Sequence, residues 1–111
     1  MEQTPKTASG LDQNVAGALA YGLGWITGAG FLLTEPENRF VRFHAMQSTI
    51  IFGALSALCI LLQVIPILGF LLVVFIVIPA SAILWLFLMF KAYQGEIFKF
   101  PVAGDIAEQK I

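Results

Sequence analysis

The densest group of polar side chains in the sequence could bind an anion, exchange a proton or hydrogen-bond between helices. Its members are Glu35, Glu37, Asn38, Arg39, Arg42, His44, Gln47 and Ser48. On a helix, His44, Gln47 and Ser48 would share one face. Ionisable groups at membrane depth are costly unless paired or used, which favours a site for a lipid phosphate, a translocating peptide or a proton. Alternatively, the two arginines anchor a helix at the cytoplasmic boundary and His44 hydrogen-bonds a neighbouring helix.

Catalytic and metal chemistry have few candidates. His44 is the one histidine and Cys59 the one cysteine, which excludes an internal disulfide and a multi-cysteine metal site. Ser56 and Cys59 would lie two to four turns deeper along the same helix, beyond hydrogen-bond reach of His44. We therefore expect no enzyme activity, no metal and no cofactor.

The composition indicates that lipid surrounds the protein. Of the 111 residues, 59% are hydrophobic and 12% are charged. Soluble domains carry roughly a quarter charged residues, so this chain lacks the polar surface to enclose a core in water. The formal net charge of -1 argues against a nucleic-acid partner.

Runs without charge predict an all-α membrane protein with three transmembrane helices. Residues 15–33 contain no charged side chain, and after Arg42 none appears until Lys91. A helix needs about 20 apolar residues to cross a bilayer, so the second run predicts two spans, 44–64 and 67–90, joined by a turn near Pro66. Residues 1–14 are predicted to be a flexible tail, and residues 91–111 an interfacial, cytoplasmic segment.

Local signals refine these helices. Ala20, Gly24 and Gly28 lie four apart on one face of the first predicted span, where another helix, of this chain or of another copy, could pack closely. Thr34 and Glu37 have the spacing of a capping box and predict a helix start. Pro79 predicts a kink in the third span.

Basic residues are unequally divided by this three-span topology. One side carries Lys6, and the other carries Arg39, Arg42, Lys91, Lys99 and Lys110. Because cytoplasmic loops are enriched in Lys and Arg, we expect a multi-pass protein of the cell membrane with its N-terminus outside and its C-terminus in the cytoplasm.

Three stretches resemble a family of small prokaryotic membrane proteins of unknown function: ALAYGLGWITG at 18–28, ENRFVRFHAMQS at 37–48 and AYQGEIFKFPVAGDIAE at 92–108. That family distantly resembles the channel subunit of the chloroplast TIC protein-import translocon. The resemblance implies a part in moving or inserting polypeptides, or a helper role in a larger membrane assembly.

These observations predict a small, non-enzymatic scaffold or accessory subunit of a larger membrane assembly. The alternative is an oligomeric transport or protein-translocation component. Expected partners are the bilayer, including anionic lipid headgroups, and other membrane subunits or further copies of the chain. The candidate lipid or partner contacts are Arg39, Arg42, His44, Gln47, Lys91 and Lys99.

Overall fold

The computed structural model describes residues 10–110, whose regular elements are all helical. The predicted tail falls largely outside the described residues, as do Lys6 and Ile111. The elements are α1 (Gln13–Leu19), α2 (Trp25–Thr34), α3 (Arg39–Leu62), α4 (Pro66–Leu72), the π-helical turn η1 (Val73–Val77), α5 (Ile78–Tyr93) and α6 (Ala103–Lys110).

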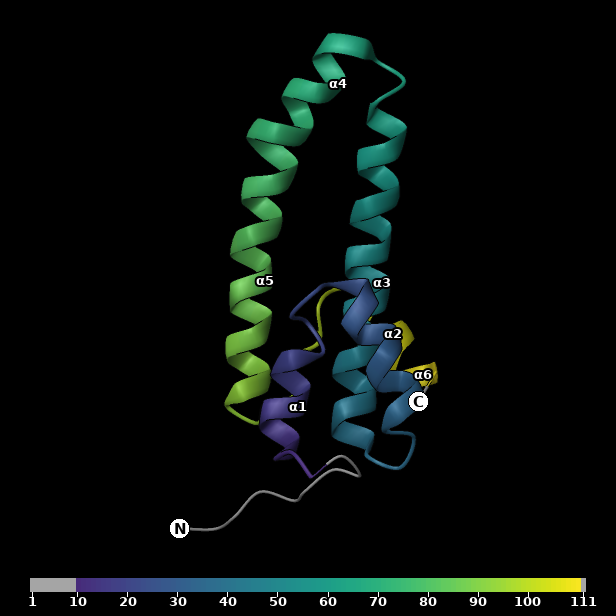
Figure 1. Cartoon of the computed structure of the whole chain (residues 1–111), viewed down its shortest axis with the longest axis vertical. Helices are drawn as coiled ribbons and strands as arrows, with labels where there is room; N and C mark the ends of the chain where they lie inside the picture. Colours follow the sequence, from purple (N-terminus) through teal and green to yellow (C-terminus); the bar gives the residue numbers. More distant parts are fainter. Residues whose placement is uncertain (1–9, 111) are drawn as a thin grey trace.

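Two long apolar helices form the frame of the molecule. The first is α3, with 24 residues, and the second runs for 28 residues through α4, η1 and α5. At about 1.5 Å per residue, each is longer than the roughly 30 Å of a hydrocarbon core. They run antiparallel and meet in a tight turn at one end of the molecule (Figure 1). By length and composition both can cross a membrane. Helix α3 contains the predicted span 44–64 up to residue 62, and the second helix contains the predicted span 67–90.

The prediction of a third span at 15–33 is not confirmed. The structure divides this stretch into α1 and α2, separated by a turn at residues 20–24. Gly24 has φ +64°, a conformation that glycine adopts easily and that a right-handed helix cannot contain. The two arms have seven and ten residues, too few to cross a bilayer singly. They fold into a short hairpin that enters and leaves at the same end of the molecule (Figure 1).

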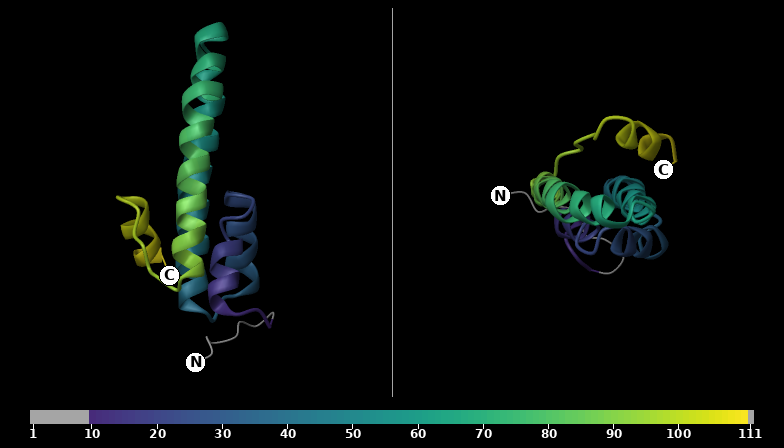
Figure 2. Two further views of the ribbon diagram at one scale, coloured as in Figure 1. Left: turned by 90° about the vertical axis from the view of Figure 1, so that its left-hand side faces the viewer. Right: turned by 90° about the horizontal axis from the view of Figure 1, so that it is seen from above.

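The molecule has three layers. The long helices form the middle layer, the α1–α2 hairpin covers one face, and residues 94–110 cover the opposite face (Figure 2). Helix α1 packs against both α3 and α5, whereas α2 and α6 pack against α3. Both ends of the described chain lie away from the turn that joins the long helices (Figure 1).

The helix boundaries differ from two local expectations. Thr34 ends α2 instead of beginning a helix, and the side chain of Asn38 caps α3 by accepting a hydrogen bond from the Val41 amide at 2.9 Å. Near Pro79, which has no amide hydrogen, the distortion takes the form of the π-helical turn η1, in which the Ile78 amide bonds the Val73 carbonyl.

The half of the long hairpin beyond the two covering layers is bare and apolar. Val64, Ile67 and Phe75 are 80%, 77% and 70% exposed. Water would make such a surface unfavourable, whereas acyl chains solvate it. The buried side chains gather at the other end, around Tyr21, Ile51 and Leu88.

Two glycines of α2 allow the packing of this helix to be tested. A Cβ at Gly28 would lie 2.7 Å from the Ala45 carbonyl oxygen and 2.7 Å from Thr49 Oγ1, whereas a Cβ at Gly30 meets no atom within 4 Å. We expect Gly28→Ala to lower the free energy of unfolding by about 1–3 kcal/mol through overpacking. Gly30→Ala should leave it unchanged or raise it by up to about 1 kcal/mol through helix propensity.

The measurement is thermal unfolding of both variants in mild detergent. Equal midpoints for the two variants would contradict the packing of α2 on α3.

Candidate functional site

Three buried polar residues form a stripe on the first turns of α3. His44, Gln47 and Ser48 are at most 1% exposed. Their spacing of three and four residues places them on one helix face. Buried polar groups away from water must find hydrogen-bond partners within the protein, so their contacts reveal what this stripe does.

On one side the stripe holds the tip of the α1–α2 hairpin. The hydroxyl of Tyr21 lies 2.8 Å from His44 Nδ1, and Gln47 Nε2 donates to the same hydroxyl at 2.8 Å. Ser48 Oγ donates to the Gly24 carbonyl at 2.9 Å. The turn between α1 and α2 is thereby fixed to α3.

On its other side the stripe holds residues 96–100, which have no regular secondary structure. His44 Nε2 lies 2.9 Å from the Glu96 carbonyl oxygen, and Gln47 Nε2 donates to the Phe98 carbonyl at 2.9 Å. The Phe100 amide donates to Gln47 Oε1 at 2.8 Å. Two side chains of α3 thus satisfy three backbone groups that no helix or sheet pairs.

The direction of each hydrogen bond follows from these partners. The Glu96 carbonyl can accept but not donate, so Nε2 of His44 carries the proton and Nδ1 accepts from the Tyr21 hydroxyl. The Tyr21 oxygen in turn accepts from Gln47. This arrangement is the neutral tautomer of His44, and both of its ring nitrogens are used within the chain.

A fourth element joins through the backbone of Tyr21. Trp85, on α5, donates from Nε1 to the Tyr21 carbonyl at 2.6 Å. In the first turn of α2, Thr27 Oγ1 donates to the Ala20 carbonyl at 3.1 Å and accepts from the Leu23 amide at 3.0 Å. The turn at residues 20–24 is therefore bonded to α2, to α3 and to α5.

The six predicted contact residues separate into two groups. His44 and Gln47 are buried and bonded inside the chain, which corrects the expectation that they contact lipid or a partner. The four basic residues lie nearer the surface. Arg42 donates from Nη1 to the Pro36 carbonyl at 3.2 Å, Lys91 pairs with Glu96 at 3.3 Å, Lys99 pairs with Glu108, and Arg39 lines an open groove.

The three predicted packing residues do not share one helix. Ala20 lies in the turn after α1, Gly24 is the N-cap of α2, and Gly28 lies within α2. Gly24 faces Phe52 and Gly28 faces Ala45 and Thr49, all on α3. The close approach in this structure is to α3 of the same chain.

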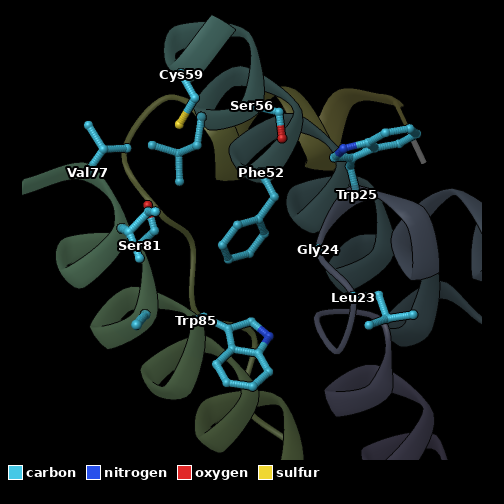
Figure 3. A pocket seen from close by; sticks show the side chains of 12 residues that line it. Leu23, Gly24, Trp25, Phe52, Ser56, Cys59, Val77, Ser81 and Trp85 are labelled. Atoms are coloured by element: carbon cyan, nitrogen blue, oxygen red, sulfur yellow. The ribbon is translucent and has the colours of Figure 1, made fainter. Parts of the chain in front are cut away.

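A cavity lies between α3, α5 and the tip of the hairpin (Figure 3). Its volume is about 390 Å³. Phe52 and Trp85 form its floor, and the small polar side chains Ser56, Cys59 and Ser81 line its walls. No cluster of three or more His, Cys, Asp or Glu able to hold a metal occurs in residues 10–110.

Sequence reasoning gave Tyr21 and Trp85 no role in the site. Both lie in stretches that read as apolar spans, where an aromatic residue ordinarily faces lipid or packs. The available signal for Tyr21 was its position before Gly22 and Gly24, a place where a helix breaks easily. Trp85 gave no comparable signal.

The sequence is similar to known membrane proteins over most of its length. The model of the magnetosome magnetite crystal formation protein family matches residues 7–107. A UPF0132 membrane protein of Methanocaldococcus jannaschii is 53% identical over 104 residues, which cover 94% of this chain and 93% of the relative. A UPF0132 membrane protein of Archaeoglobus fulgidus is 54% identical over 101 residues, covering 91% and 97%. No solved structure matches. The likeness to the chloroplast TIC subunit stays a prediction that these matches do not test.

Replacing Gln47 tests the stripe. Gln47→Met keeps the side-chain length but leaves the Phe98 carbonyl and the Phe100 amide without their partner. We expect the free energy of unfolding to fall by about 2–4 kcal/mol and residues 95–102 to become sensitive to protease.

Gln63→Met is the matched control, because Gln63 is exposed in the far turn and should tolerate the change. Equal protease resistance of the two variants would show that Gln47 does not hold the C-terminal segment.

Proposed function

The chain belongs to the magnetosome magnetite crystal formation protein family, and from this premise we propose that it is a small, non-enzymatic scaffold or accessory subunit of a larger membrane assembly. The family is named for crystal formation, whereas the two relatives are named as membrane proteins. Because exposed apolar side chains cover α4, η1 and α5, we assign this chain a supporting role in the membrane.

The observation that carries the proposal is that the buried polar groups of the stripe are engaged in holding the fold. His44, Gln47 and Ser48 bond the hairpin tip and the C-terminal segment. A reaction at these side chains would have to break that structure. An exposed apolar surface lies along α4, η1 and α5, where other membrane helices can pack.

A transport or protein-translocation role is the weaker candidate. A water-filled path needs polar side chains along its walls. The cavity between α3 and α5 offers Ser56, Cys59 and Ser81 among mainly apolar side chains. A conducting form would therefore depend on several copies of the chain.

We also propose that both ends of the described chain face the cytoplasm. With two membrane-crossing helices they lie on the same side, and so do Arg39, Arg42, Lys91 and Lys99, whereas residues 43–90 carry no charge. The excess of basic residues favours the cytoplasm for this side. The earlier expectation of an external N-terminus depended on a crossing at 15–33.

Single cysteines in a Cys59→Ser background test this topology. We expect Gln63→Cys to react with a membrane-impermeant maleimide added to intact cells. Gly10→Cys and Gln94→Cys should react only after the cells have been permeabilised. External labelling at Gly10→Cys together with internal labelling at Gln94→Cys would contradict this topology and support three membrane-crossing helices.

Photo-crosslinking in native membranes tests the accessory role. A diazirine amino acid at position 75, where Phe75 is 70% exposed, should capture one membrane subunit at fixed stoichiometry. The same probe at position 88, where Leu88 is 1% exposed, is the matched control and should capture none.

The captured complex, extracted in mild detergent, should show the mass of this chain plus that subunit and no conductance after reconstitution. A lone monomer would contradict the accessory role, and conductance would favour transport.

A further inference from the structure

A groove of about 330 Å³ lies between the first turns of α3 and the C-terminal segment. Arg39, Phe40 and Phe43 line it from α3, Ile97 lines it from the segment that follows α5, and Glu108 lines it from α6. The groove thus combines apolar walls with one cation and one carboxylate.

The two charges come from different elements. Arg39 is exposed and makes no hydrogen bond or ion pair with the residues described. Glu108 forms an ion pair with Lys99, which leaves further acceptor capacity on its two oxygens. The hydrogen bond from Lys99 and its charge, with a contribution from Arg39, hold the pKa of Glu108 below its ordinary value. Glu108 is therefore charged at neutral pH.

The groove lies at the end of α3 where the uncharged run of this helix begins. Arg39 is the first residue of α3, and the uncharged run of this helix begins at Phe43. Ile97 is 47% exposed, so the apolar wall is accessible from the side. Charged groups at the end of a transmembrane helix with apolar side chains just beyond them match an amphiphile at the membrane boundary.

The charge balance decides which headgroup fits. Residues 10–109 contain six carboxylates and four basic side chains, all at this end of the molecule. The carboxylates are Asp12, Glu35, Glu37, Glu96, Asp105 and Glu108, and the basic residues are Arg39, Arg42, Lys91 and Lys99. A purely anionic headgroup would suit Arg39 but would meet Glu108. A quaternary ammonium cannot donate a hydrogen bond to a carboxylate, whereas a primary ammonium has three donors.

We propose that this groove binds a membrane phospholipid with a primary-ammonium headgroup. Its phosphate pairs with Arg39, its ammonium group donates to Glu108, and an acyl chain follows Phe40 and Ile97. The earlier expectation of anionic lipid is replaced here by a zwitterionic one. This site does not depend on the accessory role, since it can exist whether or not another subunit binds.

The test measures thermal unfolding of the delipidated full chain in mild detergent. The fluorescence of Trp25 and Trp85 reports the unfolding. Dioleoyl phosphatidylethanolamine should raise the unfolding midpoint by about 5 °C. At equal concentration, the phosphatidylcholine and phosphatidylglycerol analogues should raise it by less than half as much. Equal shifts with all three lipids would overturn the proposal.

Two substitutions separate the two charges. Arg39→Gln should abolish the shift, because the phosphate loses its partner. Glu108→Gln should reduce the shift with phosphatidylethanolamine to that with phosphatidylcholine. If either variant kept the wild-type response, the assigned contact would be wrong.

Lys99→Gln is the matched control, because it removes the ion pair with Glu108 but keeps both charges of the groove. Its preference for phosphatidylethanolamine should remain. If Lys99→Gln lost the preference for phosphatidylethanolamine as Glu108→Gln does, the preference would depend on the anchoring of α6. That result would contradict the proposal.

A final arm uses free phosphoethanolamine, which has the headgroup without acyl chains. We expect no shift at the same concentration. A full shift would show that the apolar walls are not needed, and would overturn a lipid site. In native mass spectra, one retained phosphatidylethanolamine per chain, absent in Arg39→Gln, would support it.

Discussion

Backbone polar groups placed away from water need a partner, and in this molecule side chains of α3 supply it. The turn at residues 20–24 and the extended residues 96–100 leave carbonyl and amide groups that no helix can pair. His44, Gln47 and Ser48 bond these groups. Unsatisfied groups of this kind cost several kcal/mol each in a hydrocarbon environment. Irregular backbone can therefore exist here because it lies against this stripe.

The same constraint explains the asymmetry of the molecule. The α1–α2 hairpin and residues 94–110 both lie at one end, where the stripe is, and the other half of the long hairpin has bare apolar helices whose backbone is already paired internally (Figure 2). Polar side-chain interactions are thus concentrated at the end that carries Arg39 and Glu108. The apolar half offers a surface to lipid or to other membrane helices, consistent with a supporting role in the membrane.

Much of the fold could be predicted from hydropathy and charge. The uncharged run between Arg42 and Lys91 indicated two long helices and a turn near Pro66, since length and apolarity alone decide whether a helix can cross a bilayer. Residues 15–33 met the same criterion and still did not form one helix. Hydropathy counts apolar side chains, but it does not register that Gly24 at φ +64° ends a helix or that Trp85 accommodates the turn.

The sequence by itself determined that lipid surrounds this protein, that its fold is helical and where its polar residues lie along the chain. These properties depend on the composition and hydrophobic periodicity of short stretches of sequence. The tertiary structure alone decided what those polar residues do. Tyr21, His44, Gln47 and Phe98 are far apart along the chain, and their hydrogen bonds depend on three-dimensional distances of about 3 Å. The placement of Arg39 and Glu108 on the walls of one groove likewise arises from the docking of α6 on α3.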